Sequence, residues 1–383
     1  MSPAGLFAID KAVPNFPAPA EQTGGSTFDS RERTTEVVIG ERNLRSFIPA
    51  VNELRLRCGQ QEDLITDPRY FIAAHTQNRR VSAVLIRHHQ QLEACALFYE
   101  HYKFGIGLGI MRGGSSIGEN LVAGPEAFRL QYLQLATQAL LREWRIHGVA
   151  LSVRASLDRC IDVMGPEQKY RMFSGGKIQH KLPLESTYHA TLACMGPRTR
   201  RSLAGKRKKL EENAHVCFLP SLEPAQALEA MLSLQPRSMA KRVTRFYRAR
   251  YRLLQEFPEF FSMGMRLPDG TWLSILSGWR RNRVTYIDLQ MNDLHFKQES
   301  ISAVMRAFML EHEIACKQEL INFVGGTSLL LKRYCRPIEP CTDIFIWRPC
   351  LRATLTRMVI PPLKPKSFYT LVKTGADECN SDL

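Results

Sequence analysis

The stretch "TWLSILSGWRRNRVTYIDLQMN", residues 271–292, decides the fold of the second half of this 383-residue chain. Its two ends, 271–279 and 284–292, are rich in β-branched and aromatic residues, and they flank the basic turn "RRNR". Two strands separated by such a short polar turn are typical of an antiparallel pair. We therefore predict a pair of neighbouring strands at this point.

An amphipathic helix and a further strand follow this pair. The helix is expected from about Glu299 to Cys316, because its apolar residues recur at helical spacing. These residues are Ile301, Val304, Met305, Phe308 and Met309. "LINFVGG" (320–326) then predicts a strand that ends in glycines. Strands, helix and strand in this order indicate a mixed α/β unit with helices packed on a sheet.

The first half of the chain has the same order of elements. "TEVVIG" (35–40), "VSAVLIR" (81–87) and "LEACALFY" (92–99) predict strands, the last two joined by a turn that contains His88 and His89. A helix is expected from Pro125 to about Trp144, and "GVALSV" (148–153) predicts a buried strand. The fold class is therefore α/β (an α+β mixed sheet) with two related units in tandem.

Composition sets the expected boundaries of these units. Residues 1–33 are rich in Pro, Ala, Gly and Ser, so we expect a flexible leader. Residues 34–185 are expected to form the N-terminal unit and residues 186–355 the C-terminal, site-bearing unit. Residues 356–383 contain Pro and Lys, end in polar residues, and are expected to be a loosely held extension.

Charge and cysteine usage narrow the class of protein. The formal net charge of +15 and the pI near 9.5 favour an anionic partner. No apolar run approaches the roughly 20 residues that span a bilayer, and the start lacks the pattern of a secretion signal. The ten cysteines show no Cys-x-x-Cys or zinc-finger spacing, so we expect no metal and mostly buried free thiols. A cytoplasmic protein is the expectation, and its oligomeric state is left open.

Two basic clusters are candidate binding surfaces. "MGPRTRRSLAGKRKKLEE" (195–212) is expected to be a helix with a thin apolar seam formed by Leu203 and Leu210. The second cluster has seven basic residues, Arg237, Lys241, Arg242, Arg245, Arg248, Arg250 and Arg252, with Phe246, Tyr247 and Tyr251 between them. The two clusters could together form a wall that binds phosphate or another anionic substrate, with Arg200, Arg201, Arg207, Arg242 and Arg245 as the candidates. Solvated helix faces are the alternative.

Two motifs, about 130 residues apart, carry a resemblance to a known family. They are "STYHATLACMGPRTRRSLAGKRKKLEE" (186–212) and "INFVGGTSLLLKRYC" (321–335). The chain resembles the tandem-GNAT acyltransferases in the CelD-like and FemAB-like branch, clearly over 178–350 and thinly from residue 35. The resemblance implies an N-acyltransferase with acetyl-CoA or another acyl-CoA as donor. The acceptor would be an amine on a small molecule, a glycan, a sugar or a cell-envelope precursor.

Two alternatives stay open beside this reading. FemAB-like enzymes use aminoacyl-tRNA, so tRNA could be the donor and the basic clusters its groove. A catalytically silent GNAT scaffold that binds RNA or an anionic polymer is the other alternative. It is favoured by Asn322 and by Gly326-Thr327-Ser328, which stand where many relatives have acidic residues. The acid–base role of those acids is therefore not carried over.

The resemblance also suggests which residues hold the donor. The splayed central strand would be 284–292, and the helix that starts near 298–300 would receive the pyrophosphate. The candidate cofactor-binding residues are Gln290, Asn292, Ser300, Gly325, Gly326, Thr327, Ser328 and Lys332, the last matching the family lysine.

Three residues are candidate acid–base groups. Strand alternation puts Tyr286, Asp288, Gln290 and Asn292 on one polar face of the central strand. Asp288 and Asp293 are the candidate carboxylates on or just beyond this strand, and a solvated strand face is the alternative. By resemblance, Tyr334 would protonate the leaving thiolate, and a tyrosine that merely packs is the alternative.

Overall fold

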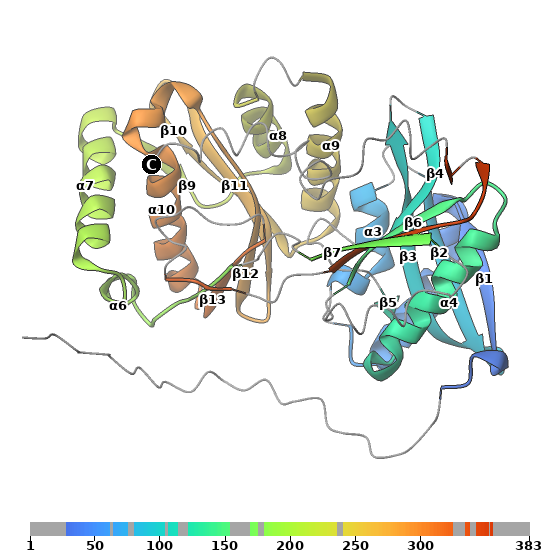
Figure 1. Cartoon of the computed structure of the whole chain (residues 1–383). Coiled ribbons are helices and arrows are strands. Elements are labelled where there is room, and N and C mark those ends of the chain that lie inside the picture. The colour runs from blue at the N-terminus through green and yellow to red at the C-terminus, as the bar shows by residue number, and fades with distance from the viewer. Residues whose placement is uncertain are drawn as a thin grey trace, which may run out of the picture.

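The computed structural model describes residues 28–61, 64–75, 80–103, 106–113, 122–153, 169–174, 180–235, 240–324, 334–337, 342–351 and 353–354. These residues form two β-sheets with helices packed against them (Figure 1). Each sheet combines antiparallel and parallel neighbours, so the mixed α/β class is confirmed. None of the helices within these ranges is long and apolar enough to cross a bilayer.

The first sheet contains β1 (Arg33–Ile39), β2 (Val81–His88), β3 (Gln91–Lys103), β4 (Ile106–Gly113), β5 (Val122–Ala123), β6 (Gly148–Val153), β7 (Lys169–Ser174) and β15 (Thr342–Trp347). The strand order is β1-β2-β3-β4-β6-β15-β7, and β5 pairs with β3. Three helices, α1 (Glu41–Ser46), α2 (Ile48–Arg57) and α3 (Pro68–His75), cover one face, and α4 (Arg129–Arg142) covers the other. Because both faces of β2 are buried, its sequence is apolar almost throughout.

The second sheet contains β8 (His180–Pro183), β9 (Cys217–Leu219), β10 (Phe260–Arg266), β11 (Trp272–Arg281), β12 (Val284–Asn292), β13 (Leu320–Phe323) and β14 (Arg336–Pro337). The strand order is β14-β8-β13-β12-β11-β10-β9. Its helices are α6 (Tyr188–Ala193), α7 (Pro197–Ala214) and α10 (Ile301–Ala315) on one face, and α8 (Pro224–Ser233) and α9 (Ala240–Glu256) on the other (Figure 1).

The predicted helices and strands are confirmed, and their ends agree with the expected ones within a few residues. The helix expected to reach Trp144 ends at Arg142, and Trp144 is 64% exposed. The expectation of mostly buried thiols is wrong for the described cysteines, since Cys95 is buried and the others are half-buried or exposed. These others are Cys58, Cys194, Cys217, Cys316, Cys335 and Cys350, and all are free thiols.

Two strands lie in a different sheet from the one that the expected boundary at 185/186 assigns. β8 precedes that boundary but pairs with β13 and β14 of the second sheet. β15 lies within the expected C-terminal unit but inserts between β6 and β7 of the first sheet. The two sheets are therefore tied together by chain segments that cross from one to the other.

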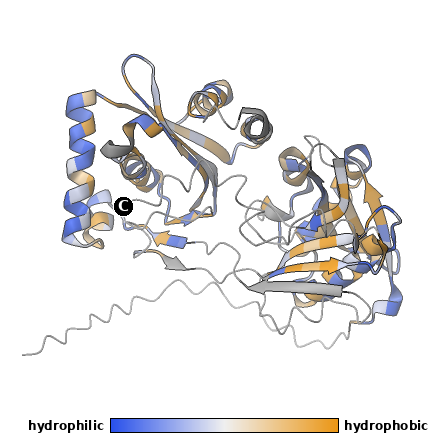
Figure 2. Ribbon diagram, turned by 45° about the horizontal axis from the view of Figure 1, so that its top comes forward, coloured by the Kyte–Doolittle hydropathy of each residue, from blue (hydrophilic) through white to orange (hydrophobic). Residues whose placement is uncertain are grey.

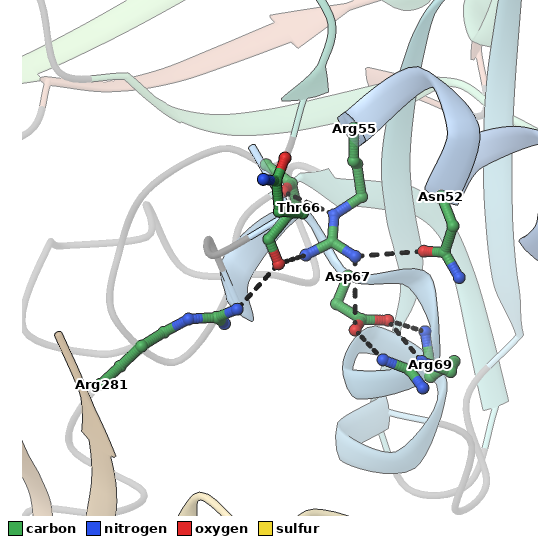
Figure 3. A network of polar contacts seen from close by, with 7 residues as sticks. Asn52, Arg55, Thr66, Asp67, Arg69 and Arg281 are labelled. Atoms are coloured by element: carbon green, nitrogen blue, oxygen red, sulfur yellow. Dashed lines mark hydrogen bonds and ion pairs between the residues drawn. The ribbon is translucent and has the colours of Figure 1, made fainter. Parts of the chain in front are cut away.

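The two halves also meet through side chains of α3, of α9 and of the start of β10. Tyr70 stacks on Phe260, with ring centroids 5.9 Å apart, and both belong to a buried apolar cluster that includes Phe257. Beside this cluster, the Gln61 carbonyl accepts hydrogen bonds from Arg55 of the first half (3.2 Å) and Arg281 of the second (2.8 Å) (Figure 3).

A buried carboxylate organises the first-half side of this contact. Asp67 accepts from Arg69 (2.7 Å) and lies 3.4 Å from the buried guanidinium of Arg55, which also donates to Thr66 (Figure 3). Burial alone would raise the pKa of Asp67, but the hydrogen bonds from Arg69 and the charge of Arg55 hold that pKa below its usual value. The ionised carboxylate therefore stabilises the folded state.

Candidate functional site

The two parallel strands at the centre of the second sheet diverge. β12 and β13 are paired as far as Ile287 and Phe323, and the Val324 N–H donates to the Ile287 carbonyl (2.9 Å). β12 then continues to Asn292, still paired with Ser274 of β11 on its other side. Among the described residues, no strand pairs with this last part of β12 on the β13 side. A short backbone edge is therefore unpaired there, beside α10.

A β-bulge lies at the point where this edge begins. Ser277 of β11 lies opposite Leu289, whereas the next residue, Gly278, lies opposite Ile287. Asp288 is consequently an extra residue on β12 that has no counterpart on β11. A bulge of this kind reverses the alternation of side chains and backbone groups along the strand beyond it.

The bulge divides the polar residues of β12 between two faces of the sheet. Tyr286 and Asp288 lie on the face covered by α9, where Asp288 forms a buried ion pair with Arg250. Gln290 lies on the opposite face, where it accepts a hydrogen bond from Arg306 of α10 (2.8 Å). The prediction that one polar face runs the length of this strand is therefore wrong, because the alternation is interrupted at Asp288.

The backbone of Gln290 and Asn292 points to the unpaired edge. The Asp293 N–H donates to the Leu273 carbonyl of β11 (2.8 Å), and successive residues of a strand direct their backbone groups to opposite sides. The side chains of Gln290 and Asn292 are hydrogen-bonded to each other (3.3 Å), and the Ser274 hydroxyl donates to Asn292 (2.8 Å). Both residues were predicted to bind the donor, and the structure brings them together at this edge.

The start of α10 lies next to the same edge. Ser300 is its N-cap residue, with left-handed backbone (φ 55°) and no side-chain capping bond, and the Gln290 amide donates to the Ser302 carbonyl (3.2 Å). The first N–H groups of a helix have no partner within it and carry the positive end of the helix dipole. Such a helix start favours an anion in general, and the role predicted for Ser300 stays a prediction.

Arg306 also lies at this edge and is missing from the sequence-based candidates. Its guanidinium carbon lies 5.5 Å from the ring centroid of Phe323, the last residue of β13, and its Nε donates to Gln290. The signal in the sequence was weak but present: Arg306 is the one charged residue within the apolar stretch "AVMRAFML" (303–310). A single charged side chain in such a stretch has to reach solvent, pair with an opposite charge or bind a ligand.

The candidate acid–base residues Asp288, Asp293 and Tyr334 do not come together around one point of this edge. Burial raises the pKa of Asp288, although its ion pair with Arg250 acts in the opposite direction, and the carboxylate faces α9. Asp293 accepts the His295 N–H (2.8 Å) in the turn directly after β12. Of the two carboxylates, Asp293 therefore lies at the end of the edge.

The Tyr334 hydroxyl is engaged with the start of α7. It accepts the Gly196 N–H (2.9 Å) and is hydrogen-bonded to the Thr199 hydroxyl (3.1 Å). Gly196 is the N-cap residue of α7 and has no side chain that could cap the helix. Tyr334 thus supplies the cap from a distant part of the chain. This contact gives the tyrosine a structural role, which was the alternative to proton donation.

The basic stretch at 195–212 forms α7, as predicted, with Leu203 and Leu210 buried against α10. Arg207 pairs with Glu211 (2.8 Å) and with Glu311 of α10 (2.7 Å), so this predicted phosphate ligand connects the two helices. The outer face of the helix is hydrophilic (Figure 2). Its exposed basic residues are Arg198, Arg201, Lys208 and Lys209, whereas Arg200 is half-buried.

The second basic cluster does not continue this surface. It lies on α9, which packs on the opposite face of the second sheet from α7 (Figure 1). Within it, Arg250 and Tyr247 are buried and Arg248 is exposed. Arg242 and Arg245 belong to α9, but their side chains lie outside the described part of the structure. The expectation of one wall built from both clusters is therefore wrong.

Several predicted donor ligands fall in a segment that the structure does not describe. These are Gly325, Gly326, Thr327, Ser328 and Lys332. Within the described ranges, one group of side chains, Glu32, His88 and His89, has ligand atoms close enough to hold a metal ion, within 4.8 Å of one another. His88 and His89 lie at the β2–β3 turn, as predicted, where His89 and Gln90 have positive φ.

Comparison with solved structures gives the fold. The chain is similar to a tandem GNAT protein from the clavulanic acid biosynthesis pathway, with a TM-score of 0.50 and 11% identity, over 82% of this chain and 98% of that one. It is also similar to FemX, with a TM-score of 0.54 and 8% identity, over 84% of this chain and 99% of that one. No protein-family model and no curated protein sequence matches the chain. The fold is thus that of this tandem GNAT protein and of FemX.

Proposed function

We propose that this protein is a GNAT-type N-acyltransferase that moves an acyl group from a coenzyme A thioester to an amine, for example on a sugar or a cell-envelope precursor. The observation that supports this most is the unpaired edge of β12 beside the start of α10. An extended pantetheine arm can pair with the backbone of Gln290 and Asn292 as an added strand would. The diphosphate can then be bound at the α10 start.

The chemistry that this arrangement has to perform is simple. The amine nitrogen attacks the thioester carbonyl, the C–N bond forms, and the C–S bond breaks. The amine loses a proton to a base, and the departing thiolate gains one. Asp293, at the end of the edge, is the candidate base, and free backbone N–H groups of β12 are the candidate donors to the oxyanion. Asp288, paired with Arg250 beneath the α9 face, is a less suitable base.

The first test is isothermal titration of the wild-type protein with acetyl-CoA and, separately, with coenzyme A at moderate salt. We expect saturable binding of both. Asn292→Pro removes the N–H that points to the edge and breaks no backbone hydrogen bond to β11. The side-chain bond from Ser274 is lost in this variant and in Asn292→Ala alike. Asn292→Ala keeps that N–H and is the matched control. Loss of binding in the proline variant alone supports backbone pairing, and no heat with either ligand in the wild type overturns the coenzyme A donor.

The exposed basic face of α7 favours a second candidate, a FemAB-like transferase that uses aminoacyl-tRNA or a silent scaffold that binds RNA or another polyanion. For each phosphate that the protein contacts, the affinity for tRNA should fall by roughly one log unit when the salt concentration rises by one log unit. We would measure tRNA binding at several salt concentrations, with Lys208→Glu and Lys209→Glu as test variants. Steep, variant-sensitive tRNA binding without acetyl-CoA binding would replace the first proposal with the second.

A further inference from the structure

Arg306 is a half-buried cation that has no carboxylate partner among the described side chains. Its Nε donates to the Gln290 side chain (2.8 Å), whereas its Nη1 is fully buried and makes no hydrogen bond. Burial lowers the pKa of this guanidinium to about 10, and the neighbouring Cys335 thiol acts in the opposite direction. No acidic side chain of the described residues forms an ion pair with it.

Three other arginines at buried or half-buried positions of the described chain each have a carboxylate partner. Arg55 is paired with Asp67 and Arg250 with Asp288. Arg280 forms a bidentate pair with the fully buried Glu313 on the same helix as Arg306. A buried charge that lacks a counter-charge destabilises the folded state strongly. Within the described residues these three arginines are neutralised and Arg306 is not, so its charge is available to a ligand.

The position of Arg306 points to a ligand as the missing partner. Its guanidinium lies between Gln290 on the unpaired edge of β12 and the ring of Phe323, where β13 ends. It is therefore at the place where the two strands diverge, about one and a half turns into α10 and away from the helix start that suits a diphosphate.

We propose that Arg306 binds the carboxylate of a small ligand held between β12 and β13, an inference that rests on the proposed acyltransferase site. A single unpaired positive charge matches a monoanion, and a planar guanidinium suits a carboxylate. A diphosphate would require further cations. The carboxylate can belong to the acyl group of the donor, as in a dicarboxylic acid monothioester, or to an amino-acid or peptide acceptor.

A matched pair of thioesters tests whether the carboxylate belongs to the acyl group of the donor. Succinyl-CoA and butyryl-CoA have acyl groups of similar length, and only the first carries a terminal carboxylate. We expect the wild-type protein to bind succinyl-CoA at least about tenfold more tightly, which is what one charge-assisted hydrogen bond provides. In Arg306→Met, which keeps the length and removes the charge, the two should bind equally. Arg142→Met, at an exposed position on α4, controls for loss of one positive charge.

Free acetate provides a probe that does not depend on coenzyme A. At constant ionic strength, replacing sodium chloride by sodium acetate should raise the Tm of the wild type, because a ligand that binds the folded state stabilises it. Arg306→Met should lose this response, because it removes the positive charge that would bind acetate. Gly-Gly and glycyl-glycinamide test whether the carboxylate belongs to the acceptor, because only Gly-Gly has a terminal carboxylate.

The outcomes separate the two proposals. A succinyl preference that Arg306→Met abolishes places the carboxylate on the donor, whereas a Gly-Gly preference that it abolishes places it on the acceptor. Failure of every thioester to bind, with an acetate response that still depends on Arg306, contradicts the proposed donor and leaves the Arg306 inference standing. If Arg306→Met changes neither the acetate response nor either preference, Arg306 binds no carboxylate and the inference is overturned.

Discussion

Asp288 was a candidate catalytic carboxylate in the sequence, but in the structure it forms an ion pair with a buried arginine. It is the extra residue of the β12 bulge, and its carboxylate is paired with Arg250 of α9. The side chains of the two residues are 8% and 2% exposed. An acid in this position neutralises a buried cation, and it is turned away from the unpaired strand edge.

Asp288→Asn should therefore act on stability. It keeps the shape of the side chain but removes the negative charge that faces the buried guanidinium of Arg250, which costs about 3 kcal/mol of unfolding free energy. Urea unfolding followed by circular dichroism measures this loss. Asp293→Asn is the comparison for stability, because Asp293 is half-exposed and the hydrogen bond that its carboxylate accepts is local, from the His295 N–H. Unchanged stability of Asp288→Asn together with abolished acyl transfer would show that Asp288 is catalytic after all.

The polar residues of β12 also show the limit of sequence reasoning at this scale. The alternation of Tyr286, Asp288 and Gln290 correctly predicted a strand, because β-structure has a period of two. It could not predict the bulge, which depends on the register between Ser277 and Leu289 on two strands. One extra residue then moved Gln290 to the α10 face, beside Arg306, where no local pattern would place it.

At the scale of elements, α7 was predicted well because its signals are local. Pro197 at the first turn, the spacing of Leu203 and Leu210, and the absence of helix breakers over most of its length all favour a helix. What starts the helix is not local. The N-cap is a glycine, and the capping hydroxyl comes from Tyr334, which is 138 residues away from Gly196.

Tyr334→Phe should consequently weaken the start of α7. Loss of one capping hydrogen bond costs about 1 kcal/mol, and the Gly196 N–H is left without this acceptor. Thermal or urea unfolding would measure the change, with Tyr251→Phe as control, since that hydroxyl makes a local, exposed bond with Gln255. A Tyr334→Phe variant that keeps wild-type stability but loses transfer would instead support the proton-donor role predicted from the resemblance.

At the scale of the whole molecule, the chain does not divide into two consecutive units. The order of elements predicted two similar sheets because each half repeats strands, helix and strand. The composition gave no sign that β15 inserts between β6 and β7, since strand pairing over such a separation leaves no periodic signal in either segment. The first sheet is thus completed only when the last described strand has been made.

This arrangement predicts what a truncation would do. A chain that ends at Pro337 lacks β15, so β6 loses one partner and β7 loses the partner through which it joins the sheet. We expect faster hydrogen exchange in 148–153 and 169–174, measured by mass spectrometry, while 284–292 stays protected because β12 keeps β11 and β13. A chain that ends at residue 354 retains β15 and should exchange like the full-length protein. If the shorter chain lost protection in the second sheet and kept it in the first, β15 would not hold the first sheet together. The folding of the N-terminal half would then be independent of the segment that follows the proposed site.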